Sequence, residues 1–173
     1  MTGVQTCALP ICFPVTILDK TIKRAYRLWQ PDPLVRCFHV ACAFDNNKLI
    51  ECAYNNPVTV NAKAFKMGER FNIPTYKEYP FPHAESHLVS KLLDRYNSID
   101  TNWKIVVLRI NREGRILLSK PCKNCQKILD ALELHNVFYS TNEDTFSNNN
   151  NEIFYSNLIN TIHNNFHYTK SVV

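Results

Sequence analysis

KIVVLRI, residues 104–110, is a nearly unbroken apolar run of strand length. Such runs are typical of strands that are buried on both faces, inside a sheet with helices on either side. The turn Asn111–Gly114 follows it directly. We therefore expect this segment to be a central strand, and we read the rest of the chain outward from it.

Helical and extended patterns alternate on both sides of this run. Before it we expect a helix from an Asp19 cap to about Gln30, a hairpin of Cys37–Phe44 and Leu49–Tyr54, a short helix over Ala62–Phe71 and a helix from His83 to about Tyr96. After it we expect extended chain over Ile116–Ser119, a helix from Pro121 to about Leu134 and a strand over Val137–Ser140. This order predicts an α/β fold of three layers, α/β/α, with a mixed central sheet.

Two short segments at the predicted helix starts carry chemistry: HAE at 83–85 and PCKNC at 121–125. One imidazole, from His83, and two thiolates, from Cys122 and Cys125, bind a divalent metal and leave a fourth tetrahedral position open for water. Three residues apart in the first turn of a helix, the two sulfurs share one face. The helix dipole and the metal both favour the thiolate form.

Glu85 is placed to move protons rather than to bind metal. A zinc ion makes its bound water acidic enough to yield hydroxide near neutral pH. Attack of that hydroxide on an aromatic C–NH₂ carbon needs one proton at the ring nitrogen and another on the departing ammonia. Glu85 is the expected shuttle for both.

Each part also has a simpler interpretation. A lone C-x-x-C can be a redox pair, and a lone H-x-E on a helix usually faces solvent. A structural zinc site would normally have four protein ligands, but His87, His135 and Cys52 lack ligand spacing to the other three. We expect His87 to support the site from outside or to face solvent.

The combined pattern H-x-E…P-C-x-x-C resembles the signature of zinc-dependent nucleobase deaminases of the cytidine deaminase-like superfamily. The resemblance covers Asp19 to Ser140. It implies Zn²⁺ on His83, Cys122 and Cys125, with Glu85 as the catalytic residue. In YNNP, residues 54–57, it implies that Asn55 binds the base or sugar of the substrate, with Asn56 as the competing assignment.

The resemblance implies a hydrolase that converts a cytosine-type base, in a free cytidine or deoxycytidine nucleoside or nucleotide, to the uracil form with release of ammonia. One alternative is a deaminase of bases within RNA or single-stranded DNA. Another is a non-catalytic, zinc-stabilised binding domain. Family members also commonly form homo-oligomers, and the direction of a late strand separates nucleoside-type branches from the others.

Composition fits one soluble domain, residues 12–173, since the chain has 173 residues, 45% of them apolar. No apolar run is long enough to cross a bilayer, so we expect no membrane partner and a cytoplasmic location. The net charge of +5 is modest. Lys20, Lys23, Arg24 and Arg27 fit a solvated helix face better than a nucleic-acid contact.

The two ends of the chain carry little of this interpretation. Residues 1–11 lack the basic start of a signal peptide and resemble a translated sequencing adapter, so we exclude them and Cys7 from fold reasoning. Asn148–Asn151 is predicted to be a surface loop, and residues 166–170 could close over a substrate or fray.

Cys37, Cys42 and Cys52 are expected to be reduced core residues, and Cys12 is unassigned.

Overall fold

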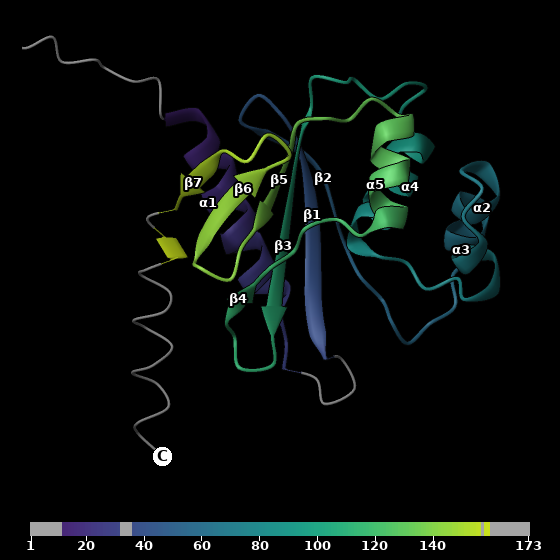
Figure 1. Ribbon diagram of the computed structural model, residues 1–173, viewed down its shortest axis with the longest axis horizontal. Helices are drawn as coiled ribbons and strands as arrows, with labels where there is room; N and C mark the ends of the chain where they lie inside the picture. Colours follow the sequence, from purple (N-terminus) through teal and green to yellow (C-terminus); the bar gives the residue numbers. More distant parts are fainter. Residues whose placement is uncertain (1–11, 32–35, 157, 160–173) are drawn as a thin grey trace, which may run out of the picture.

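The computed structural model describes residues 12–31, 36–156 and 158–159. A seven-stranded sheet lies at its centre, with helices on both faces (Figure 1). The strand order is β2-β1-β3-β5-β6-β7, and β4 pairs with β3 beside this path. Both parallel and antiparallel pairs occur, so the predicted α/β/α fold with a mixed central sheet is confirmed.

The elements have the following bounds. The strands are β1 (Cys37–Asp45), β2 (Lys48–Tyr54), β3 (Lys104–Asn111), β4 (Ile116–Leu117), β5 (Val137–Ser140), β6 (Thr145–Asn148) and β7 (Ile153–Tyr155). The helices are α1 (Cys12–Leu28), α2 (Ala62–Arg70), α3 (Pro74–Glu78), α4 (Ala84–Arg95) and α5 (Lys123–Ala131).

Strand β3 lies inside the sheet, as its sequence predicts. It runs antiparallel to β1 and parallel to β5, and Val106 pairs with Cys42 on one side and Phe138 on the other. Residues 105–108 of β3 are all fully buried. This is possible because helices cover both faces of the strand.

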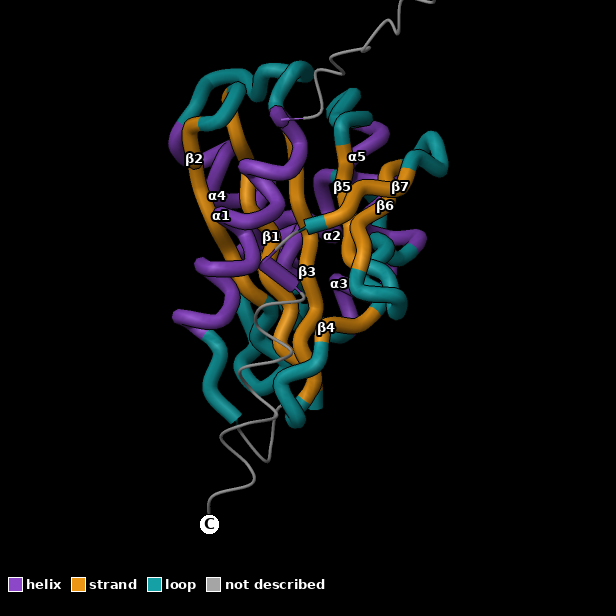
Figure 2. The backbone as a smooth tube through the Cα atoms, turned by 90° about the vertical axis from the view of Figure 1, so that its left-hand side faces the viewer, coloured by secondary structure: helices purple, strands orange, loops and turns teal. Residues whose placement is uncertain are grey.

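Alternate residues of the strands feed two separate cores. Ala41, Ile105 and Val107 belong to the core beneath α4 and α5. Val106 and Leu108 point the other way, into the core beneath α1. Figure 2, viewed from the side of α1, shows this helix in front of the sheet.

Two predicted helix ends are wrong. Helix α1 begins at Cys12, so Asp19 lies within it and does not cap it, because the buried Ile17 and Leu18 extend the apolar stripe toward the N-terminus. Helix α5 ends at Ala131 instead of about Leu134. Glu133 has a positive φ of 56°, and the amide of Leu134 donates to the carbonyl of Leu129, which closes the helix.

Helix α3 and strand β6 were not predicted. Strand β6 is polar in sequence, yet Thr145 and Ser147 are buried against the neighbouring strands. Strand β6 follows β5 through a tight turn at residues 141–144 and runs antiparallel to it. Asn148 ends this strand, and exposed residues 149–152 form the loop that the asparagine run predicts. The proposals for residues 1–11 and 166–170 concern segments outside the described residues.

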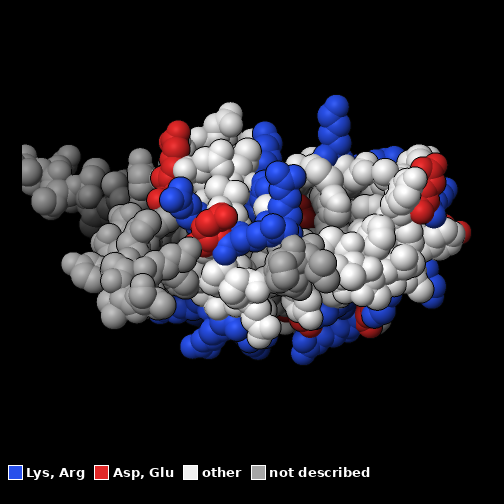
Figure 3. Space-filling model, turned by 90° about the horizontal axis from the view of Figure 1, so that it is seen from below, with Lys and Arg blue, Asp and Glu red and all other residues white. Residues whose placement is uncertain are grey.

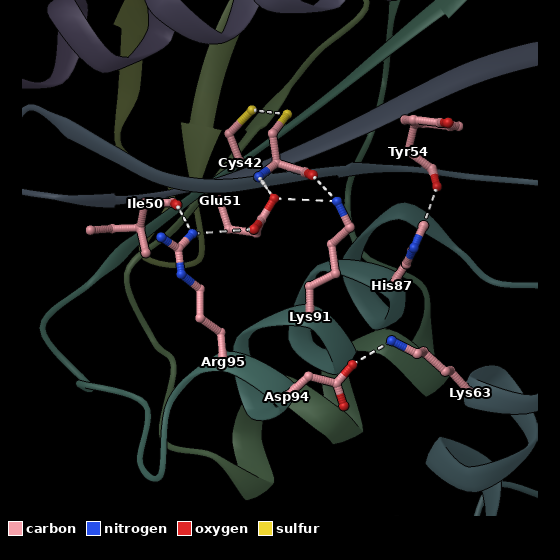
Figure 4. A network of polar contacts seen from close by, with 10 residues as sticks. Cys42, Ile50, Glu51, Tyr54, Lys63, His87, Lys91, Asp94 and Arg95 are labelled. Atoms are coloured by element: carbon pink, nitrogen blue, oxygen red, sulfur yellow. Dashed lines mark hydrogen bonds and ion pairs between the residues drawn. The ribbon is translucent and has the colours of Figure 1, made fainter.

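Helix α4 is fastened to the edge strand β2 by a polar network (Figure 4). The Lys91 ammonium contacts Glu51 Oε1 at 3.2 Å and the Cys52 carbonyl at 2.9 Å, and Arg95 lies 3.6 Å from Glu51. His87 Nδ1 lies 2.9 Å from the Tyr54 carbonyl. Partly exposed ion pairs contribute little stability, so we assign the network to orienting α4 on the sheet.

Cys42 and Cys52 lie opposite each other on β1 and β2, with their sulfurs 2.7 Å apart. Both are free thiols, and Cys42 is fully buried in the core beneath α1. Cys37 is half-buried and also free.

Among the described helices, none is long and apolar enough to cross a membrane.

Leu88 tests how firmly α4 is packed on the sheet. Its side chain is fully buried, so Leu88→Ala should lower the free energy of unfolding by about 2–5 kcal/mol. Leu118→Ala is the control, because Leu118 is 42% exposed and its replacement should cost about 0.5 kcal/mol or less. Urea denaturation measures both, and equal losses would contradict the packing described here.

Candidate metal centre

Two helix starts bring the candidate ligands together. His83 is the N-cap of α4 and Cys122 is the N-cap of α5, each with an extended backbone, and Cys125 lies in the first turn of α5. Neither cap side chain makes a capping hydrogen bond. Their side chains are therefore free to serve the site instead.

The three ligand atoms fit one tetrahedral metal ion. His83 Nδ1 lies 3.5 Å from Cys122 Sγ and 3.4 Å from Cys125 Sγ, and all three atoms lie within 4.8 Å of one another. Ligands at ordinary zinc–sulfur and zinc–nitrogen distances are about 3.6 Å apart in a tetrahedron. The donor set and its spacing thus fit zinc. Among the described residues, no fourth His, Cys, Asp or Glu joins this group.

The two cysteines have very different proton affinities. A hydrogen bond from the Cys125 thiol, with a further one from His83, lowers the pKa of Cys122 to about 3. The same pairing with Cys122, together with burial, raises the pKa of Cys125 well above its ordinary value. Cys122 is therefore a thiolate at neutral pH, which is the form that binds a metal. Metal binding would release the remaining thiol proton of Cys125.

Tyr76, on the unpredicted helix α3, supports the ligands from behind. Its hydroxyl lies 3.5 Å from Cys125 Sγ and donates to Ser86 Oγ at 3.2 Å, and Ser86 Oγ donates to the His83 carbonyl at 3.1 Å. Its ring also packs edge-on against the His83 ring. Burial raises the pKa of Tyr76 far above its ordinary value, so the hydroxyl remains a donor. Supports of this kind hold metal ligands in orientation.

A cavity of about 280 Å³ opens beside the ligands. It is lined by His39, Asn55, Pro57, Phe81, Pro82, His83, Ala84, Glu85, Lys120 and Cys122. Glu85 is only 5% exposed, and burial raises the pKa of its carboxyl group. A carboxylate with a raised pKa exchanges protons more readily near neutral pH.

Asn55 lines the cavity, but its amide also holds the sheet. The amide oxygen accepts from the His39 backbone N–H at 2.8 Å, and the amide nitrogen donates to the Cys37 carbonyl at 3.1 Å. One N–H and one lone pair remain for a substrate, so substrate binding by Asn55 stays a prediction. Asn56 is not among the cavity-lining residues, and its side chain accepts from the amides of Val58 and Thr59.

The sequence did not single out three of the lining residues: His39, Phe81 and Lys120. His39 had a signal, since it is the one imidazole within the apolar run of residues 37–44. Burial, with the nearby charges of Arg109 and His83, lowers the pKa of His39 to about 4. Its imidazole is neutral at pH 7 and can hydrogen-bond without adding charge.

No protein-family model matches the chain, and a search of curated proteins finds no similar sequence.

Zinc content tests the ligand set. The purified protein should hold about one zinc ion per chain, and Cys122→Ala should lose it together with thermal stability, because binding free energy contributes to folding. Cys52→Ser is the control, since Cys52 lies on β2 beside Cys42 and away from the cluster. Elemental analysis and a thermal melt measure both properties. Zinc retained by Cys122→Ala would contradict the assignment.

The titration of His39 tests the buried cavity wall. Its imidazole should titrate near pH 4 instead of 6.5, as followed by NMR. A bound cation would lower this pKa further. Between these two values the unfolded chain binds more protons than the folded one, so the free energy of unfolding should fall as the pH drops through this window. A His39 pKa at or above 6.5 would contradict this environment.

Proposed function

We propose that the chain is a zinc-dependent hydrolytic deaminase that converts a cytosine-type base to the uracil form and releases ammonia. One observation carries the proposal: the buried Glu85 carboxyl lines the same cavity as His83 and Cys122, beside a three-residue ligand set. The HAE and PCKNC segments that build this arrangement resemble those of the cytidine deaminase-like superfamily.

His83, Cys122 and Cys125 would hold the zinc ion. When bound, zinc supplies Lewis acidity that makes a water molecule an effective nucleophile near neutral pH. The two thiolates and the neutral imidazole balance its charge. Three protein ligands, instead of four, are typical of catalytic rather than structural zinc sites.

Glu85 would move the protons of the reaction. It takes one proton from the attacking water and delivers it to the ring nitrogen. It then takes the second proton, from the hydroxyl group left on the attacked carbon, and transfers it to the amino group, so that C=O forms as ammonia leaves. The net reaction consumes one water, replaces C–NH₂ by C=O and leaves Glu85 in its starting state. Its burial keeps bulk water from competing for these protons.

The cavity walls suit a flat heterocycle. Phe81, Pro57 and Pro82 supply apolar surface, while His39 and Asn55 offer hydrogen-bonding groups. At about 280 Å³ the cavity is at the low end for small-molecule sites. It fits a single base, with the sugar toward the opening.

A non-catalytic zinc-stabilised domain remains the competing function from another class. Such a domain would need the three ligands but would have no use for a buried carboxyl group in a cavity. The cost of burying an ionisable group is readily explained when that group takes part in catalysis. Glu85 therefore separates the two hypotheses.

Glu85→Gln should abolish ammonia release, with a loss of at least about 10²–10⁴-fold, while zinc content and thermal stability are retained. The control is Glu69→Gln, which changes an exposed carboxyl on α2 and should leave turnover unaltered. The assay screens the zinc-loaded protein against nucleosides, nucleotides and short oligonucleotides. Turnover by Glu85→Gln at the level of the unmodified protein would rule out the assigned role.

A further inference from the structure

Two cations lie near the candidate active site: Lys120 lines the cavity, and Arg109 lies opposite the cavity-lining His39 in the sheet. Arg109 is on β3, and Lys120 is in the segment that leads into α5. Among the described residues, no carboxylate forms an ion pair with either one. The cavity itself has one acidic lining residue, the buried Glu85. Lys120 is the one Lys or Arg of the cavity wall, and Asp130 lines the two depressions that adjoin it.

Arg109 is held next to the cavity wall by strand register. It pairs directly with His39 of β1, and directly opposed residues project from the same face of a sheet. His39 lines the cavity, so Arg109 lies on the same side of the sheet, beneath the segment that leads into α5. His39 is near the start of β1 and Arg109 near the end of β3. These strand ends lie at the end of the sheet where α4 and α5 begin (Figure 1).

The Arg109 guanidinium is incompletely satisfied. One of its nitrogens, Nη2, donates to Cys37 Sγ at 2.9 Å, while Nε is buried and has no hydrogen-bond partner. A thiol sulfur is a weak acceptor for a charged donor. Burying part of a guanidinium without an anion is costly, and a bound oxyanion would offset this cost.

Lys120 stands where the cavity meets the outer surface. It lines the cavity and also two adjoining surface depressions, of about 520 and 440 Å³. Its neighbour Ser119 is fixed by hydrogen bonds to the carbonyls of Ser140 and Val107, at 2.9 and 2.8 Å. The Lys120 ammonium lies 5.9 Å from the centre of the Tyr139 ring and is exposed. Seen from below, Lys and Arg side chains gather near the middle of the molecule, with Asp and Glu side chains beside them (Figure 3).

We propose that Arg109 and Lys120 bind a phosphate group of the substrate, so that the enzyme acts on a nucleotide in preference to a free nucleoside. This inference rests on the proposed deaminase function. The cavity fits a base, and the sugar and its phosphate then lie toward the opening, where Lys120 stands. A planar guanidinium and a mobile ammonium are both suited to phosphate oxygens. The phosphate can belong to a mononucleotide or to a polynucleotide backbone.

The first experiment compares kcat/KM for cytidine, cytidine monophosphate and a short cytosine-containing single strand. The zinc-loaded protein should prefer the phosphorylated substrates by about 10- to 100-fold, as expected for hydrogen bonds to charged groups. Lys120→Gln should lower kcat/KM for the nucleotide far more than for cytidine. Lys66→Gln is the matched control, because Lys66 is exposed on α2 and lines neither the cavity nor the two depressions beside Lys120.

The two phosphorylated substrates separate the sources of the phosphate. Preference for the monophosphate, with a weak dependence on salt, assigns a mononucleotide. Preference for the single strand, with affinity falling steeply as salt rises, assigns several backbone phosphates and so a polynucleotide. Equal kcat/KM for cytidine and both phosphorylated substrates would overturn the proposal.

The second experiment measures binding without turnover. Uridine and uridine monophosphate, the expected products, are titrated into zinc-loaded Glu85→Gln and followed by calorimetry. The monophosphate should bind about 10-fold or more tightly than uridine, and adding Lys120→Gln should remove most of that difference. If Arg109→Gln folds, it should also remove most of the affinity difference between uridine monophosphate and uridine. If it does not fold, Lys120→Gln alone tests the phosphate site. Equal affinities for the two products would overturn the phosphate site.

These outcomes separate the two proposals. Monophosphate binding that depends on Lys120, in a protein that deaminates none of the substrates, would refute the deaminase and retain the phosphate site. Deamination of cytidine at the same efficiency as both phosphorylated substrates would refute the phosphate site and retain the deaminase.

Discussion

The burial of β3 on both faces is the constraint on which the rest of the structure depends. It requires a helical layer on each side of the sheet, and it places β3 between antiparallel β1 and parallel β5. Parallel neighbours need a long crossover, which α5 supplies. Helix α4, which precedes β3 in the chain, lies in the same helical layer as α5. Both helices therefore begin at the end of the sheet where β3 and β5 finish, and this brings His83 and Cys122 together.

Ligands of open α/β sheets commonly bind outside the carboxyl ends of the strands. Here that position also collects the positive ends of two helix dipoles, which favour thiolates and other anions. The site is consequently rich in groups that stabilise negative charge: the two helix starts, the ligand histidine, Lys120 and Arg109. Glu85 is the exception, and its burial in this environment is the observation on which the proposed proton transfer rests.

Most of the fold and part of the site could be predicted from the sequence, because the signals are local. The apolar run at 104–110 and the hairpin ending at Tyr54 form the predicted strands, and HAE and PCKNC form helix starts whose ligand atoms converge. Helix α3 is too short to show the repeating apolar spacing that identifies a helix in a sequence. Strand β6 is polar yet buried, because its neighbours in the sheet cover it. Its burial is a tertiary effect that no local pattern records.

The contributions of Arg109 and Tyr76 could not be predicted for a related reason. Their roles come from strand register and from packing between elements distant in the sequence, as when Arg109 pairs with His39 or Tyr76 reaches Cys125. We infer that one imidazole and two thiolates hold a zinc ion with room for a further ligand. X-ray absorption at the zinc edge measures this coordination. We expect two sulfur atoms at about 2.3 Å and two lighter atoms at about 2.0–2.1 Å from the zinc ion, whereas four sulfur ligands or no bound zinc would contradict the inference.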